Sequence, residues 1–260
     1  MSNLDFDDEV ARNQEAISNT AVFVAQRRQT IQVLGIKPGE RIIDIGTGTG
    51  HLAFDIAVET GGANELVGVD ISEDMLAIAR ERCADYPAVK FESGSVYDLP
   101  FPNKSFDVVN SVQVFEYLND VPKALAEAYR VLKPDGRLLI RDTDWRTLLW
   151  RSGDSMRMER ILAAWDLHLE DPYLPQTLSL HMKEAGFEVR QVEPFVTLET
   201  QINESCSGFY IVKFIEPYVV SQGIEQSEAD EWVADLHQQA QRGSYFYSLN
   251  SYAFAAVKMA

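Results

Sequence analysis

The sequence predicts an open, doubly wound α/β fold with a mostly parallel sheet, on three observations. From residue 41 onward, short apolar runs rich in β-branched residues alternate with amphipathic helical patterns. The run Lys133-Pro134-Asp135-Gly136 separates a helix from the next strand, because proline cannot continue a helix and glycine accepts turn geometry. The chain has 260 residues, 46% of them hydrophobic and 24% charged, so it can bury a core without disulfides. Helices between strands predict right-handed crossovers, and therefore parallel strands.

A helical arm is predicted ahead of the sheet, at residues 1–40. Four apolar residues recur every seven positions and so share one face of a helix: Val10, Ile17, Val24 and Ile31. Gly35 and the pair Pro38-Gly39 end this helix.

The core of the fold is predicted at residues 41–145. Its strands are expected at residues 41–46, 65–70, 89–94, 106–112 and 136–142, with helices between them at 51–60, 73–84 and 121–133. Residues 146–260 are expected to add helical elements and the last two strands of the same sheet. Those elements are helices within 155–186, broken near 171–175, and at 208–222 and 226–242, with strands at 187–198 and 245–259. We expect the helices between these two strands to form a lid over the strand ends.

Charge and cysteine content exclude several classes of partner. Lys and Arg number 23 and Asp and Glu 40, so the formal net charge is −17. Such a chain is poorly suited to bind the phosphate backbone of a nucleic acid or an anionic membrane surface, because proteins bind both mainly through Lys and Arg. The chain has only two cysteines, and its acidic N-terminus lacks a signal-peptide pattern. It also has no apolar run near the ~20 residues of a membrane span. These features favour a location in the cytoplasm. The oligomeric state stays open.

The strongest local signal is the run Asp44-Ile45-Gly46-Thr47-Gly48-Thr49-Gly50, which follows an apolar strand and opens a helix. Glycines let a backbone pass close to a ligand, and the helix N-terminus offers free N–H groups. The next strand ends in Asp70, whose carboxylate can accept hydrogen bonds from a ribose diol. The glycine spacing, with His51 after Gly50, departs from the G-x-G-x-x-G pattern, and no Gly-Lys-Ser/Thr follows as in a P-loop. The simplest alternative is an ordinary strand-to-helix turn.

Four motifs in order carry a resemblance to a known family. They are RIIDIGTGTG (41–50), VGVDISEDML (67–76), GSVYDLPFPNKSFDVVNSVQVFEYLND (94–120) and EAYRVLKPDGRLLI (127–140). Over residues 30–145 the sequence resembles the class I S-adenosylmethionine-dependent methyltransferases, most closely the small-molecule branch that includes ubiquinone/menaquinone-biosynthesis methyltransferases. The resemblance implies a Rossmann-like sheet with an antiparallel last strand, and S-adenosylmethionine as cofactor.

The resemblance also assigns cofactor-binding residues, position by position. They are Asp44, Gly46, Thr47, Gly48 and Gly50 for the methionine part, Asp70 for the ribose, Ile71, Ser95 and Val96 for the adenine, and Ser111, Val112 and Gln113 for the methionine or methyl region. The family commonly has Asp at position 95, where this chain has Ser.

Catalytic candidates cluster after the fourth and fifth predicted strands. Methyl transfer is an in-line displacement, so the protein mainly aligns the reactants and excludes water, and a base is needed only if the acceptor must lose a proton. Glu116 stands where many relatives carry the first of two histidines. Asp142 and Asp144 are two apart on an extended segment and so point the same way. Their alternative role is helix capping. The four histidines show no zinc-site spacing, and no metal is expected.

Substrate contacts are expected from Tyr117, Trp145, Phe23 and Arg27. Arg27 and Arg28 would reach the cofactor's carboxylate or the substrate; the alternative is two solvated charges on an exposed helix face. Asp171-Pro172-Tyr173 resembles part of a signature of amino-group methyltransferases, but it lies far beyond the fourth strand and is interpreted as a turn.

The predicted function is methyl transfer from S-adenosylmethionine to a small organic metabolite at an O, N or C atom. A first alternative is a nicotinamide-dependent (NAD) oxidoreductase, which shares the strand, glycine loop, helix and acid but wants its third glycine at position 51. A second is a non-catalytic module that binds S-adenosylmethionine, an alternative kept open by the missing histidine pair at 116–117.

Overall fold

The computed structural model describes residues 8–259, with side chains from residue 13 onward. Within these residues the chain forms two compact units, each assembled from separate segments. Unit 1 comprises the chain up to residue 26 together with residues 144–172 and 196–250, and unit 2 comprises residues 27–143, 173–195 and 251 onward. Val10, one of the residues expected on the helical face of the arm, lies outside the residues with described side chains.

Unit 2 is built on a mixed sheet, which confirms the predicted fold class. Among residues 8–259 the sheet has seven strands in the order β3-β2-β1-β4-β5-β7-β6. Their bounds are β1 Arg41–Ile45, β2 Glu65–Asp70, β3 Val89–Ser93, β4 Phe106–Val112, β5 Leu132–Trp150, β6 Phe187–Glu199 and β7 Tyr247–Lys258. β1 to β5 pair in parallel, and the last strands are antiparallel. β5, β6 and β7 each continue along the chain into segments of unit 1.

The first strand, β1, lies between β2 and β4. Ile43 pairs with Val67 of β2 and with Val109 of β4, so all three strands run side by side in the same direction. Most of their side chains on both faces are apolar and buried, as expected of a parallel sheet covered by helices on both sides. The buried polar exceptions in β1 and β4 are Asp44, Asn110 and Ser111. The carboxyl ends of β1, β2 and β4 therefore meet at one edge, where the glycine run and Asp70 lie.

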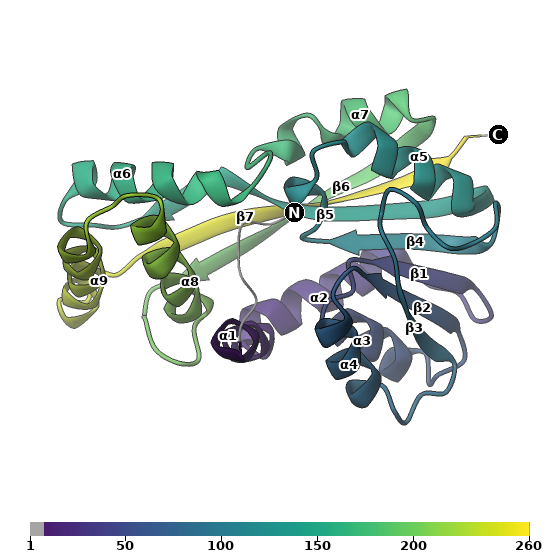
Figure 1. Ribbon diagram of the computed structural model, residues 1–260, viewed down its shortest axis with the longest axis horizontal. Coiled ribbons are helices and arrows are strands. Elements are labelled where there is room, and N and C mark those ends of the chain that lie inside the picture. Colours follow the sequence, from purple (N-terminus) through teal and green to yellow (C-terminus); the bar gives the residue numbers. More distant parts are fainter. Residues whose placement is uncertain (1–7, 260) are drawn as a thin grey trace. The chain divides into compact units, whose positions relative to one another are not determined.

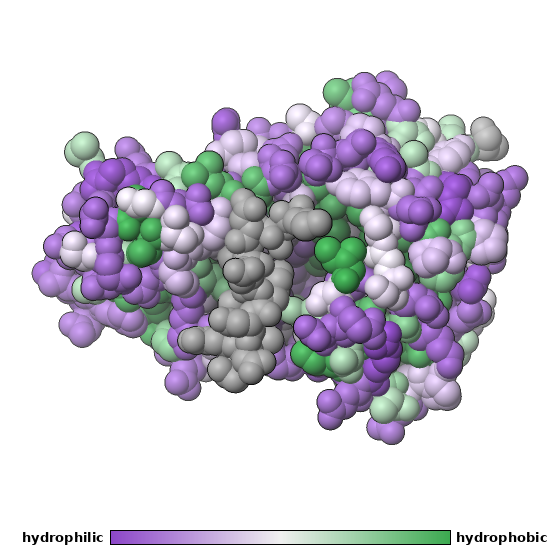
Figure 2. Space-filling model, viewed as in Figure 1, coloured by the Kyte–Doolittle hydropathy of each residue, from purple (hydrophilic) through white to green (hydrophobic). Residues whose placement is uncertain are grey.

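Helices cover both faces of this sheet (Figure 1). On one face pack α3 (His51–Glu59), α4 (Glu73–Arg82) and the last turns of α2 (Ala21–Leu34), through residues such as Leu34, Ile56 and Leu76. On the other face pack α5 (Val121–Val131) and α7 (Leu178–Glu184), through Leu125 and Leu178. The visible surface is mainly hydrophilic, as expected of a globular chain in which 24% of the residues are charged (Figure 2).

Local signals explain where these helices begin and how α5 joins β5. The Asp120 carboxylate accepts a hydrogen bond from the Lys123 N–H and caps α5, whose first turn also holds a proline. The predicted turn at Lys133–Gly136 takes the form of a bulge in β5. The pairing with β4 skips from Leu132 to Arg137, and Asp135 has a φ of 61°.

Unit 1 holds α1 (Asp8–Ser18), α6 (Ser155–Trp165), α8 (Ser207–Ser221), α9 (Gln226–Gln241) and the short 3₁₀ helix η2 (Asp166–His168). Its core is rich in aromatic side chains, with Trp150 packed edge-on against Trp232 and Tyr247. Pro172 and Tyr173 form a turn, which confirms the turn predicted at Asp171-Pro172-Tyr173. The Pro172 carbonyl accepts a hydrogen bond from the Trp145 N–H of β5. No helix within residues 8–259 is long and apolar enough to cross a membrane.

Two expectations about the elements are wrong. The arm is not one helix but two, α1 and α2, separated at Asn19-Thr20. The Asn19 side chain donates to the Glu15 carbonyl and the Thr20 hydroxyl to the Ile17 carbonyl, and such side chains compete with the helix for backbone groups. The fifth strand does not end at Asp142 but continues to Trp150, so Asp144 lies within a strand and not after one. The docking of the later helices as a lid stays a prediction.

Candidate functional site

The loop between β1 and α3 turns sharply on three glycines. Gly46, Gly48 and Gly50 have φ values of 71°, 53° and 76°, in the left-handed region that favours glycine. A Cβ at Gly46 would lie 2.2 Å from the Val114 side chain, and one at Gly50 would lie 2.8 Å from Ala79 Cβ. A Cβ at Gly48 would meet nothing within 4 Å. Two glycines therefore allow close packing inside the protein, whereas Gly48 leaves its backbone bare toward open space.

Asp70 at the end of β2 is tied directly to this loop. Its Oδ2 accepts a hydrogen bond from the Gly48 N–H at 2.9 Å, and its Oδ1 accepts one from the Ser72 N–H at 3.0 Å. The carbonyl of Val69, one residue earlier, accepts the N–H groups of Gly46 and Thr47. A carboxylate has about four lone-pair positions, so Asp70 keeps acceptor capacity for a diol. The structure thus brings the glycine loop and the acid together, as the sequence predicts.

Asp44, at the end of β1, is buried beneath the loop. It accepts hydrogen bonds from the Thr47 hydroxyl at 2.8 Å and from the Asn110 amide at 2.6 Å. Burial raises the pKa of Asp44 to about 6, and the charge of Asp70 adds to the increase, while the two hydrogen bonds act against it. Sequence reasoning missed Asn110. Its signal is an amide side chain that directly follows the apolar pair Val108-Val109 within the buried stretch of β4.

The residues assigned to the adenine follow β2 and β3. Ile71 is 71% exposed, although it follows directly on Asp70. The Ser95 hydroxyl accepts a hydrogen bond from the Tyr97 N–H, and Val96 is partly buried against the core of unit 2. Exposed and directly after Asp70, the Ile71 side chain offers an apolar surface on which a flat ring could pack.

The segment after β4 lies against the glycine loop. The Ser111 hydroxyl donates to the Ile45 carbonyl at 2.9 Å and so ties the end of β4 to the end of β1. Gln113 follows with a φ of 59°, unusual for a residue that is not glycine, and its side-chain amide bonds to the Thr143 hydroxyl. The side chain of Val114, the next residue, occupies the space that a Cβ at Gly46 would need.

Two of the predicted catalytic acids are buried acceptors of backbone N–H groups. Asp142 Oδ1 accepts from the Val114 N–H at 3.0 Å, and Glu116 Oε2 accepts from the Thr143 N–H at 3.1 Å. Burial raises the pKa of Asp142 to about 8, although backbone N–H groups following β4 act against it. Burial, with the nearby carboxylates of Glu116 and Asp142, raises the pKa of Tyr117 well above its ordinary value. The proton-accepting roles of Glu116 and Asp142 stay predictions.

Unit 1 contains three further predicted residues: Asp144, Trp145 and Phe23. The Asp144 carboxylate is buried and accepts a hydrogen bond from the Arg146 N–H. Trp145 packs edge-on against Trp165, with ring centroids 5.7 Å apart, and Phe23 is partly buried against the same aromatic core. The substrate roles of Trp145 and Phe23 and the catalytic role of Asp144 stay predictions.

Arg27, in unit 2, contradicts the interpretation that it is a solvated charge on an exposed helix face. It is buried, and its Nε lies 2.6 Å from Asp55 Oδ2, so it is not a solvated charge on an exposed face. Arg28, next to it, is exposed. In the part of the chain that the structure describes, no group of three His, Cys, Asp or Glu side chains is placed to hold a metal ion.

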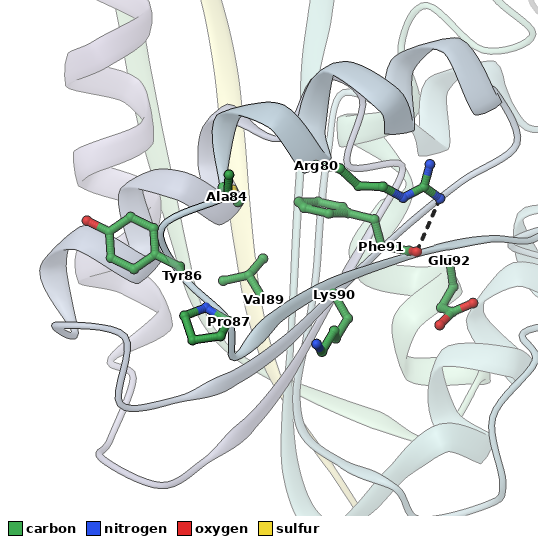
Figure 3. Close-up of a pocket in the computed structure, with 9 residues that line it drawn as sticks. Arg80, Ala84, Tyr86, Pro87, Val89, Lys90, Phe91 and Glu92 are labelled. Atoms are coloured by element: carbon green, nitrogen blue, oxygen red, sulfur yellow. Dashed lines mark hydrogen bonds between the residues drawn. The ribbon is translucent and has the colours of Figure 1, made fainter.

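A separate cavity of about 310 Å³ lies in unit 2 between α4 and the edge strand β3 (Figure 3). Arg80, Tyr86 and Phe91 contribute to its wall, and Arg80 donates a hydrogen bond to the Phe91 carbonyl. The predicted cofactor-binding residues do not line it. This cavity is therefore distinct from the glycine-loop site.

Together, the parallel sheet, the glycine loop and the acid at the tip of β2 form the arrangement with which open α/β proteins bind nucleoside-containing ligands at the carboxyl ends of their strands. Residues 36–192 match the model of a methyltransferase domain family. This match covers more than half of the chain, so the protein belongs to the methyltransferase domain family. The resemblance predicted from the four motifs is confirmed.

Individual relatives agree with this family. The chain is 31% identical over 189 residues to an uncharacterized 37.1 kDa protein in transposon TN4556 of Streptomyces fradiae, covering 71% of this chain and 54% of that protein. It is 34% identical over 139 residues to a demethylmenaquinone methyltransferase of Symbiobacterium thermophilum, covering 51% of this chain and 55% of the relative. The chain thus spans about half the length of these two relatives.

A solved structure supports the fold. The phosphoethanolamine N-methyltransferase 2 of Haemonchus contortus, in complex with S-adenosyl-L-methionine, superimposes with a TM-score of 0.63 at 23% identity. The comparison covers 100% of this chain and 59% of that one. At this identity the likeness concerns the fold alone.

Proposed function

We propose that the protein transfers the methyl group of S-adenosylmethionine to a small organic metabolite. The observation that carries the proposal is the loop at Gly48. The space beside its backbone is open, and its N–H donates a hydrogen bond to Asp70, the residue proposed to bind the ribose. A Cβ would fill this cradle, so the residues present fit a nucleoside ligand at this position. Membership of the methyltransferase domain family supports the choice of donor.

The residues of the site have separate roles in this proposal. S-adenosylmethionine, when bound, supplies a methyl group already activated by a positively charged sulfur. Asp70 holds the ribose hydroxyls, Ile71 supports the adenine, and Asp44 supplies negative charge beneath the methionine part. Ser111 and Gln113 line the methyl end. Alignment of donor and acceptor and exclusion of water account for most of the catalysis expected here.

The acceptor is proposed to be a small molecule. The net charge of −17 disfavours nucleic acid as substrate, because affinity for nucleic acid comes largely from Lys and Arg. If the acceptor must lose a proton, Glu116 and Asp142 of unit 2 are the proposed carboxylates, with Tyr117 and Arg27 of the same unit as proposed substrate contacts. The roles expected for Asp144, Trp145 and Phe23, which belong to unit 1, stay predictions from the sequence. Both cysteines are free, which suits a reducing compartment, and we place the protein in the cytoplasm.

Calorimetry with the methyl donor and its demethylated product, S-adenosylhomocysteine, tests the proposal. We expect binding of both ligands, and transfer of label from methyl-labelled donor to at least one member of a panel of phenols, amines and quinol precursors. A thermal shift with NAD(H) and none with the methyl donor would favour the oxidoreductase alternative. Binding without transfer across the panel would favour a non-catalytic module.

A further inference from the structure

Asp142 and Thr143, two consecutive residues of β5, form hydrogen bonds with the segment that follows β4, Gln113–Glu116. Asp142 accepts the N–H of Val114, and Thr143 contacts both Gln113 and Glu116. Because successive side chains of a strand point to opposite faces, the two residues reach this segment from opposite sides of the sheet. The segment Gln113–Glu116 is thus held at several points by a strand that neighbours β4.

Thr143 makes the most specific of these contacts. Its hydroxyl donates to Gln113 Oε1 at 2.9 Å and accepts from Nε2 of the same amide at 2.5 Å. Its N–H donates to Glu116 Oε2 at 3.1 Å, and Thr143 is buried. One residue therefore orients both a neutral amide and a carboxylate of the segment after β4.

The backbone of Gln113 needs such support. Its φ of 59° lies in the left-handed region, which raises the free energy of a residue other than glycine. Conformations of this kind persist where the surrounding structure holds them, and they gather at ligand sites. The backbone N–H of Gln113 also donates to the Arg141 carbonyl at 2.7 Å, so both its backbone and its side chain are fixed by β5.

This segment forms the wall against which the glycine loop lies. Gly46 approaches the Val114 side chain so closely that a Cβ at Gly46 would overlap it. A displacement of Gln113 and Val114 would therefore alter the loop that carries Gly48. The hydrogen bonds of Thr143 therefore act on the proposed cofactor site indirectly, because they hold the segment against which the glycine loop packs.

We infer that Thr143 is a positioning residue for the methyl donor, holding the Gln113 amide and the adjacent wall of the glycine loop in their binding geometry. The inference rests on the proposed function. It assigns a role to a residue that the motifs do not mark, because Thr143 lies beyond the last of them.

Three single variants of the full chain test it. Thr143→Val keeps the shape of the side chain but removes the hydroxyl, and Thr143→Ser restores the hydroxyl. Thr60→Val is the matched control, since the Thr60 hydroxyl also makes one part-buried hydrogen bond, to the Ile56 carbonyl, in the same unit. Calorimetry with S-adenosylmethionine and thermal unfolding are measured for each variant and for the wild type.

For Thr143→Val we expect a Kd for the donor raised about tenfold, because the variant loses both hydrogen bonds between the hydroxyl and the Gln113 amide. Thr143→Ser should stay within about twofold of the wild type, and Thr60→Val should match the wild type in Kd while its melting temperature falls as much as that of Thr143→Val. Equal donor affinity in Thr143→Val and in the wild type would overturn the inference and leave the proposed function standing. No donor binding by the wild type would overturn both.

A double-mutant cycle separates positioning from a general loss of stability. Gln113→Asn keeps an amide and a residue type that tolerates a positive φ, but it shortens the side chain so that it no longer reaches Thr143. If the two side chains act through one contact, the double variant should bind the donor no more weakly than either single variant. Fully additive losses of affinity would contradict the inference.

Discussion

At the scale of single residues, the glycine loop shows how much of a site's geometry can be predicted from local sequence. Three glycines after a strand predict a tight turn, but their spacing alone does not say which of them faces a ligand. The structure separates them, because Gly46 and Gly50 contact Val114 and Ala79, whereas Gly48 contacts neither. The family resemblance assigned all three glycines to the cofactor, and the open space at Gly48 singles out this glycine as the one proposed to face it.

Gly48→Ala should weaken binding of S-adenosylmethionine at least tenfold while the protein stays folded. The added Cβ occupies the open space and the left-handed backbone is strained by about 1–2 kcal/mol. Gly39→Ala is the matched control, because Gly39 also has a positive φ, 81°, and open surroundings but lies in the turn before β1. Calorimetry and circular dichroism check the pair. Equal loss of affinity in both variants would mean that backbone strain, and not the ligand, is responsible.

Asp44 should make donor binding depend on pH. Its pKa is raised to about 6, so the carboxylate beneath the loop is charged above that pH and neutral below it. The affinity for the positively charged donor should therefore fall as pH drops from 7 to 5. For folding the sign is opposite, because a raised carboxylate pKa stabilises the protein at low pH, and this contribution is lost as pH rises from about 4 to about 6.

Calorimetry between pH 5 and pH 8 checks this prediction. Asp44→Asn removes the titrating group and should bind the donor weakly with little pH dependence. A wild-type affinity that stays constant across this range would contradict the assignment of Asp44 to the donor site.

At the scale of elements, helix boundaries were predictable where a cap or a proline marks them. α5 begins at Val121, after the capping Asp120, as expected from the sequence. β5 was predicted too short because its second half pairs with a distant part of the chain. In unit 1, for example, the Asn250 N–H donates to the Thr147 hydroxyl, 103 residues away in sequence. A run with mixed polar and aromatic residues becomes a strand once such a neighbour is present.

Asp120→Ala should destabilise the protein by about 1 kcal/mol, since it removes the side chain that accepts the Lys123 N–H at the start of α5. This corresponds to a fall of about 2–4 °C in melting temperature for a domain of this size. Asp120→Ser should recover most of the loss, because serine also caps helices well. Thermal unfolding of the three proteins provides the measurement, and a neutral Asp120→Ala would show that the cap contributes little here.

At the scale of the whole molecule, the charge of −17 is the dominant property that composition alone predicts. Like charges repel within a compact chain, and salt screens that repulsion. From the same excess of carboxylates we expect the protein to have little affinity for polyanions.

Raising NaCl from about 10 mM to about 150 mM should therefore raise the melting temperature, as the screening length shortens from about 30 Å to about 8 Å. At the higher salt concentration the protein should not shift a DNA duplex in a gel assay. A melting temperature that falls with salt would mean that attractive ion pairs, such as Arg137 with Glu40, outweigh the repulsion. Retarded DNA would contradict the proposed exclusion of nucleic acid.

The sequence by itself determined the alternation of strands and helices, the glycine loop and the acid at the tip of β2. These features depend on periodicity and on backbone geometry over a few residues, so they can be recognised from the sequence without knowing the fold. Only the tertiary structure decided that Arg141 is buried and held by Gln29, Thr30 and Ser251, that Asn110 supports Asp44, and that Thr143 holds Gln113. Such partners lie 30 to 112 residues apart, and no local pattern specifies which distant side chains will meet once the sheet has formed.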